Sequence, residues 1–140
     1  MKTKPYLFPV HNVRAYPAST QVVEVYQQPD EASGKPSYEK NALWALLQAG
    51  WKLDQIAYQV PIEGGRLSRN GLLIDFILYT PSPIPIQVGS TWWHRDSSLE
   101  TLEDARISNW FGRLPIRLFD IEVDTHEHAL ASVLREIGHA

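Results

Sequence analysis

The sequence predicts a small α/β protein, and three observations lead to that prediction. The chain has 140 residues, 44% of them hydrophobic and 21% charged, which fits one folded domain with one core. From residue 37 on, stretches with helical apolar spacing alternate with short β-type runs in the order αβββαβα. Strand–helix–strand connections favour a mixed central sheet flanked by helices.

Residues 1–36 differ from the rest of the chain. They hold five of the ten prolines, and within them residues 21–26 (QVVEVY) read as a short strand. We therefore predict an extended, proline-containing N-terminal arm at 1–36, followed by one domain at 37–140. The arm is either a plain surface segment or a site for a protein partner or self-association.

The first half of the domain reads as one helix and three strands. Ser37 is a good N-cap, and Gly50 is a good C-terminal stop for a helix between them. Residues 55–62 form a strand-like run, and glycine turn signals follow it. Residues 72–80 (LLIDFILYT) are almost continuously apolar, which predicts a strand buried on both faces. A proline-rich turn then leads to a third strand at 84–89.

The second half reads as helix, strand and helix. Ser97 and Ser98 open a helix that runs to about Phe111, with a possible capping box formed by Glu100. A strand is predicted at 116–123. The last helix begins near Asp124 or Thr125, and its apolar face is supplied by Ala129, Val133, Leu134 and Ile137.

Composition excludes several classes of protein. The net charge of −3 gives no overall basic field, so any nucleic-acid contact must come from a local patch. The absence of cysteine excludes disulfides and thiolate metal sites. The N-terminus is a poor secretory signal, and no apolar run reaches the roughly 18 residues of a membrane helix. We expect a soluble cytoplasmic protein, or a component of a virion or other assembly.

Asp75 is the most informative residue of the sequence. It stands in the middle of the apolar run at 72–80, where an ionised carboxylate is costly unless it is paired, hydrogen-bonded or bound to a metal. One interpretation is an ion pair with an arginine. The candidates for that pair are Arg66, Arg69 and Arg106.

The alternative interpretation is a metal site. Gln87 occupies a comparable place in the next apolar strand, and adjacent strands can direct both polar groups at one point. The first helix can bring Glu39 to the same point. Carboxylate and amide oxygens are hard ligands that suit Mg²⁺ or Mn²⁺. The sequence therefore predicts a metal centre formed by Glu39, Asp75 and Gln87.

Short motifs in a fixed order support this hypothesis. They are SYE ending at Glu39, YQVPIEGG beginning at Tyr58, LIDF containing Asp75, IQVG containing Gln87, WWH ending at His94, and GRLPIRLF beginning at Gly112. In this order and spacing, residues 37–138 resemble the PD-(D/E)XK nuclease superfamily, and more narrowly the branch of very-short-patch repair endonucleases and small phage-type relatives.

The resemblance implies a restriction-endonuclease-like core and a metal-dependent endonuclease acting on DNA, with RNA as a possible substrate. Asp75 would be the principal ligand of Mg²⁺ or Mn²⁺, and Glu39 would assist it. Gln87 would stand at the family's second acid, and His94 would match the catalytic histidine of the W-H pair.

Two departures from the family pattern support a second hypothesis. Gln87 removes one negative charge, and Gly89 stands where the family has a lysine. Both departures favour a catalytically weak or silent member of the same fold. Such a protein would have a structural or interaction role in a phage particle or a nucleic-acid machine.

The remaining candidates have simpler explanations as well. Arg66 and Arg69, at the tip of a turn, and Arg95 are the basic residues expected to contact a phosphate backbone, although turn solubility explains the tip equally well. The tryptophans at 92–93 either stack on bases or fill the core. The histidines at 126 and 128 lie two residues apart at a helix start, so they face different directions and are not expected to share a metal.

Overall fold

The computed structural model describes residues 37–62, 71–89 and 98–140, with the backbone alone at 98–101. The order αβββαβα predicted from the sequence is confirmed. The elements are α3 (Tyr38–Gln48), the 3₁₀ turn η1 (Leu53–Gln55), β1 (Ile56–Ile62), β2 (Leu72–Thr80), β3 (Ser82–Val88), α4 (Ser98–Phe111), β4 (Ile116–Leu118), the 3₁₀ turn η4 (Asp120–Glu122) and α5 (His126–Glu136).

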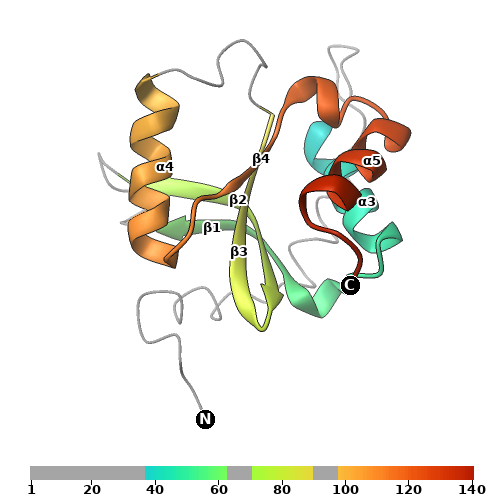
Figure 1. Ribbon diagram of the computed structural model, residues 1–140, viewed down its shortest axis with the longest axis horizontal. Helices are drawn as coiled ribbons and strands as arrows, with labels where there is room; N and C mark the ends of the chain where they lie inside the picture. The colour runs from blue at the N-terminus through green and yellow to red at the C-terminus, as the bar shows by residue number, and fades with distance from the viewer. Residues whose placement is uncertain (1–36, 63–70, 90–97) are drawn as a thin grey trace.

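The four strands form one mixed sheet in the order β1-β2-β3-β4. β1, β2 and β3 are antiparallel neighbours, and β4 runs parallel to β3. Figure 1 shows α4 on one side of the sheet and α3 with α5 on the other. The parallel pair and the two helical layers are the arrangement that the sequence predicts.

Each face of the sheet has its own hydrophobic core. On the α4 side, Ile107 and Phe111 of the helix contact the strands. On the other side, α3 and α5 supply most of the helical residues. The strand residues on the α4 side are Ala57, Val60, Ile62, Ile74 and Ile77, and those on the α3/α5 side are Ile56, Tyr58, Phe76, Leu78, Ile86 and Leu118.

The alternation of faces breaks at one level of β1 and β2. Tyr58 faces the α3/α5 core, but Val60, two residues later, faces the α4 core. In β2 the same change occurs between Ile74 and Phe76. Residues two apart on a regular strand share a face, so both strands shift phase together. Gln59 at the break of β1 has φ +50°, and Asp75 is the residue at the break of β2.

The helices on the α3/α5 side are tied together at both ends. Ser37 and Thr125 cap α3 and α5 by accepting hydrogen bonds from the backbone N–H groups of residues 40 and 128. The side-chain amide of Asn41 donates to the carbonyl of Val123 at 2.8 Å. At the other end, the backbone of Ala140 donates to Ala49 at 3.0 Å. These links fix α3, and with it Glu39, over the sheet.

The strand predicted at 116–123 is wrong in its second half, because β4 ends at Leu118 and η4 follows. The carboxylate of Glu122 accepts a hydrogen bond from the backbone N–H of Phe119 at 3.0 Å, and its carbonyl accepts one from the Ser132 hydroxyl. These local bonds replace the ladder bonds that a longer strand would need. The apolar residues Ile121 and Val123 mimic a strand in the sequence.

The third strand begins at Ser82, two residues earlier than predicted. Its prolines, Pro83 and Pro85, lie before Ile86, where pairing with β4 starts. That part of β3 has β2 on one side only among the described strands, so a missing proline N–H costs little there. None of the helices in the described ranges has the length and apolar character to span a membrane.

Candidate functional site

Two carboxylates meet between α3 and β2. Glu39 lies in the first turn of α3, and Asp75 lies at the phase break of β2. Their side chains are within hydrogen-bonding reach of one another. The buried phenol of Tyr58, on β1, donates a hydrogen bond to Oε1 of Glu39 at 2.6 Å. Three elements therefore meet at this acid pair.

The strands β2 and β3 separate at the same place. Their paired ladder ends at Phe76 and Ile86, and side chains take over the hydrogen bonds beyond it. The backbone N–H of Val88 donates to Oδ2 of Asp75 at 2.8 Å. This bond holds the Asp75 carboxylate in the opening between the strands.

Gln87 fills the opening from the other strand. Its Oε1 accepts a hydrogen bond from the backbone N–H of Asp75 at 2.8 Å, and its Nε2 donates to the carbonyl of Leu73 at 3.1 Å. The structure thus places Gln87 beside Asp75, as predicted, and commits its amide to the β2 backbone. An amide can make both bonds, whereas a carboxylate has no donor for the carbonyl.

Burial raises the pKa of Asp75 from 3.8 to about 7. The charge of Glu39 and its hydrogen bond act in the same direction, whereas the Val88 N–H and the charge of Arg117 lower the pKa. Two close carboxylates in a partly dry site cannot both ionise cheaply. Burial therefore disfavours the ionised form of Asp75, and a cation bound between the two acids would favour it.

The structure also accounts for Gly89. Its φ of +98° is a conformation that a side-chain-bearing residue adopts only with strain. A Cβ at this position would lie 3.8 Å from Oδ1 of Asp120 and 3.8 Å from a ring carbon of Tyr38. The backbone conformation, more than the space, therefore opposes a lysine at this position.

The acid pair has the donor set of a hard-cation site. In the described ranges, no group of three or more His, Cys, Asp or Glu residues is arranged to hold a metal ion. Mg²⁺ commonly takes one or two carboxylates and fills its remaining positions with water and substrate oxygens. Glu39 and Asp75 fit that pattern without a third acid, and the predicted contribution of Gln87 is weakened because its oxygen already accepts a hydrogen bond.

The alternative of an arginine partner for Asp75 finds no support in the described residues. No ion pair joins Asp75 to a basic side chain of those ranges, Arg106 included. Arg66 and Arg69 lie outside the described residues. So do Arg95, His94 and the tryptophans at 92–93, and their predicted roles are not addressed by the described geometry.

The two histidines of α5 have separate partners, as their spacing predicts. His126 stacks on Trp44 of α3, with ring centroids 4.0 Å apart and planes 5° apart. His128 lies 2.5 Å from Asp124 through Nδ1. His126 therefore packs on α3, and His128 contacts the residue just before the N-cap of α5.

Sequence reasoning missed Tyr58 and the Val88 N–H. Tyr58 follows two buried apolar residues in β1, so it reads as a core aromatic, and its hydroxyl is the signal that could have identified it.

No family model matches the chain, and no match was found among curated proteins or solved structures.

Proposed function

We propose that this protein is a divalent-metal-dependent endonuclease that hydrolyses DNA phosphodiesters, built on a restriction-endonuclease-like core. The observation that supports it is the pair formed by Glu39 and Asp75 at the point where β2 and β3 separate. The element order and the parallel β3–β4 pair agree with that core. The finer fold and the reaction are both part of this proposal.

In this mechanism both acids would bind the metal, and a different group holds each of them in place. Glu39 and Asp75 would hold Mg²⁺ or Mn²⁺, which supplies an activated water and neutralises charge on the phosphoryl group. Tyr58 fixes the orientation of Glu39, and the Val88 N–H fixes Asp75. Since protonated Asp75 is a poor ligand, deprotonation of Asp75 as the pH rises past about 7 favours metal binding.

Contacts with nucleic acid are proposed for residues outside the described ranges. Arg66, Arg69 and Arg95 would hold the phosphate backbone, and His94 would assist proton transfer. The substrate is proposed as DNA, with RNA as an alternative that the nuclease assay separates.

A cleavage assay on the full chain tests the proposal. Single-stranded, duplex, mismatched and branched DNA and single-stranded RNA are incubated with Mg²⁺ or Mn²⁺, and cleavage is expected to disappear in Asp75→Ala. The matched control is Asp54→Ala, since Asp54 is exposed in η1 and should leave cleavage unchanged. Intact substrates with both metals would refute the nuclease proposal.

A second candidate is a catalytically silent member of the same fold that acts as a structural or interaction protein, for example in a virion. Two observations favour it: the Gln87 amide is committed to the β2 backbone, and Gly89 has a positive φ. This candidate predicts association through residues 1–36 and no loss of function in Asp75→Asn. Metal-dependent cleavage that requires Asp75 would exclude it.

A further inference from the structure

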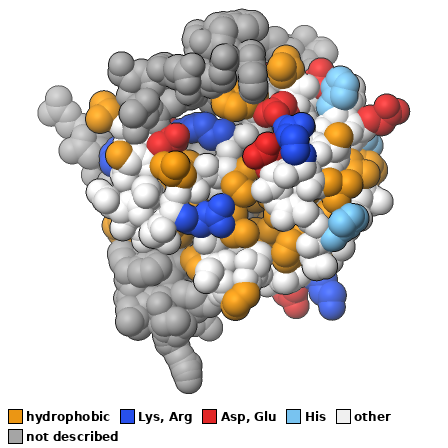
Figure 2. Space-filling model, in the orientation of Figure 1, with side chains coloured by type: hydrophobic (Ala, Val, Ile, Leu, Met, Phe, Trp, Pro, Cys, Tyr) orange, Lys and Arg blue, Asp and Glu red, His pale blue; other side chains and the backbone are white. Residues whose placement is uncertain are grey.

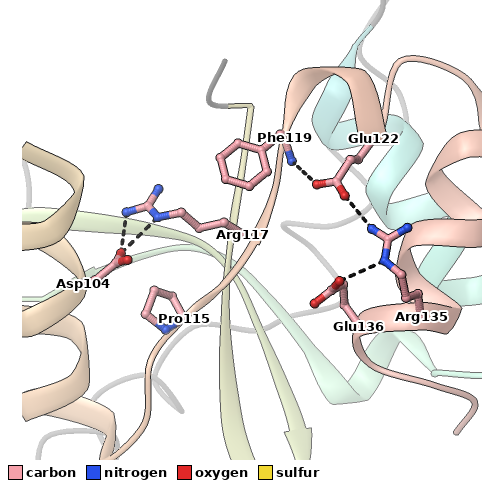
Figure 3. Close-up of a pocket in the computed structure, with 7 residues that line it drawn as sticks. All are labelled: Asp104, Pro115, Arg117, Phe119, Glu122, Arg135 and Glu136. Carbon is pink, nitrogen blue, oxygen red and sulfur yellow. Dashed lines mark hydrogen bonds and ion pairs between the residues drawn. The ribbon is translucent and has the colours of Figure 1, made fainter. Parts of the chain in front are cut away.

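A hollow runs along the edge of the sheet at β4, which is the last strand among those of the described residues. Its volume is about 570 Å³. Figure 2 shows acidic and basic side chains next to each other on this face, with hydrophobic side chains between them. The lining residues are Asp104, Pro115, Arg117, Phe119, Glu122, Arg135 and Glu136 (Figure 3).

Two charged clusters flank this hollow, one on each side of β4. In Figure 3, Arg117 turns toward α4, and Arg135 lies on α5 between two acids. Each cluster combines one guanidinium with two carboxylates, so each has a net charge of −1 and the two together −2. The clusters are Arg117 with Glu103 and Asp104, and Arg135 with Glu122 and Glu136.

Three exposed hydrophobic residues lie close in the sequence to residues that line the hollow, and we call them the rim residues. The large hydrophobic residues that are most exposed in the described ranges are Leu102 at 65%, Leu114 at 62% and Ile121 at 53%. Leu114 lies two residues before β4, Ile121 lies three residues after it, and Leu102 precedes Glu103 on α4. A sheet edge with an apolar rim and a net negative charge is suited to an extended, basic segment.

We propose that this edge is the docking site of the chain's own residues 1–22. This segment contains Lys2, Lys4 and Arg14 and no acidic residue, so its charge complements the hollow. Its three prolines oppose helix formation, and proline is tolerated in a strand at a sheet edge. The apolar run at 6–10 (YLFPV) can cover the rim residues.

The described part of the chain starts close to this hollow. A Cβ at Gly89 would touch both Tyr38 and Asp120, which places the start of α3 near η4, whose last residue, Glu122, lines the hollow. Residues 23–36 then join the docked segment to α3. Fourteen extended residues span up to roughly 46 Å, so the segment reaches β4 of its own chain.

Disulfide trapping in the full chain tests the proposal, because the natural sequence has no cysteine. Ile121→Cys is combined in turn with Leu7→Cys, Val10→Cys or Val13→Cys under mild oxidation. The control replaces Ile121→Cys with Asp54→Cys, since Asp54 is exposed next to β1, at the opposite edge of the sheet. At least one arm position is expected to form a disulfide within the monomer many times faster with the Ile121 variant than with the control.

Charge provides an independent measurement. Reversal of Lys2, Lys4 and Arg14 to glutamate should slow trapping severalfold, and added salt should slow it in the natural sequence. Glu136→Lys in the hollow should have the same effect, whereas Glu127→Lys, an exposed residue of the same helix, should have none. Equal trapping at residues 54 and 121, disulfides formed only between two chains, or trapping insensitive to these charges would each overturn the proposal.

Discussion

The acid pair of α3 and β2 and the arginine clusters beside β4 are two ways of placing carboxylates in one small protein. Arg117 donates to Asp104 through Nε and Nη2 at 3.0 and 2.7 Å and is largely buried. In the described ranges, no ion pair to a basic side chain reaches Glu39 or Asp75. An arginine offsets part of the charge of each cluster, whereas no basic side chain of the described residues forms an ion pair with the acid pair.

From this difference we expect the arginine-paired acids to be structural and the acid pair to be functional. An acid that is paired with arginine keeps its charge and stabilises the fold. In the acid pair, which is held by a phenol and a backbone N–H, ionisation of both carboxyl groups is unfavourable. A bound cation would make that ionisation more favourable. Four substitutions test whether the two regions differ in this way, and they are taken in decreasing order of their expected effect on the free energy of unfolding.

Asp75→Asn should have the largest effect, and the effect should depend on pH. The folded pKa of about 7 lies above the ordinary value of 3.8, so the folded protein keeps a proton that the unfolded chain loses in this window. The free energy of unfolding of the natural protein therefore falls as the pH rises from about 4 to 7, by an amount on the order of 4 kcal/mol. An asparagine keeps a neutral side chain that can still accept the Val88 hydrogen bond.

Urea denaturation at a series of pH values measures this difference. The variant should equal the natural protein near pH 4 and exceed its stability by a few kcal/mol above pH 7. Asp54→Asn is the matched control and should leave the slope with pH unchanged, because Asp54 is exposed. Parallel stability profiles for Asp75→Asn and the natural protein would show that the acid pair is not strained.

Arg117→Ala should be next in size. Removal of the guanidinium leaves Glu103 and Asp104 without their common partner, and loss of one member of a buried pair costs about 3 kcal/mol. Arg135→Ala is the matched comparison, because Arg135 is 53% exposed and an exposed pair contributes at most about 1 kcal/mol. Thermal unfolding of both variants measures the difference, and equal losses would contradict the assignment of Arg117 as the structural arginine.

Gln87→Glu separates the two roles proposed for residue 87. If Gln87 is a weakened metal ligand, a glutamate should tighten Mn²⁺ binding. The described hydrogen bonds predict no such gain. In the variant, a carboxylate oxygen would replace Nε2 and face the carbonyl of Leu73, with no hydrogen to donate to it. The expected loss of stability is about 1–3 kcal/mol, without a gain in Mn²⁺ affinity by calorimetry.

The matched control for this variant is Gln55→Glu. The side chain of Gln55 also joins two backbone groups, those of Lys52 and Tyr79, but it lies in η1 away from the acid pair. Its replacement should cost less because the bond that it loses, from Nε2 to the carbonyl of Tyr79, is already long at 3.4 Å. Tighter Mn²⁺ binding in Gln87→Glu would restore the view that this position is a ligand.

The sequence predicted the order of elements well because apolar spacing and helix caps are local signals. Ser37 and Gly50 mark the ends of α3, and the apolar run around Asp75 marks β2. The same locality explains the error at 116–123, where alternating apolar residues imitate a strand but Glu122 and Ser132 satisfy the backbone instead.

The candidate site was predicted in position more than in detail. One polar residue in each of two apolar strands indicated that Asp75 and Gln87 lie together, and the first helix indicated Glu39. The hydrogen bonds of the Gln87 amide depend on the angle at which β2 and β3 separate, and the role of Gly89 depends on its φ of +98°. Neither quantity is encoded in residue type, so one sequence alone cannot give them.

Tyr58→Phe should have the smallest effect on stability and the most informative effect on binding. The variant loses one hydrogen bond to Glu39, which is worth about 1 kcal/mol, and the buried ring stays in place. If the phenol fixes Glu39 as a ligand, Mn²⁺ affinity should fall by roughly 10- to 100-fold, as it does when a partner that orients a ligand is removed. Trp51→Phe is the matched control, since it also removes one aromatic hydrogen bond, that from Nε1 to Gly138 at 3.3 Å. It should reduce stability to a similar degree and leave Mn²⁺ affinity unchanged. Equal Mn²⁺ affinities in the two variants would make Tyr58 a core residue with an incidental hydroxyl, and not a residue that positions Glu39 as a ligand.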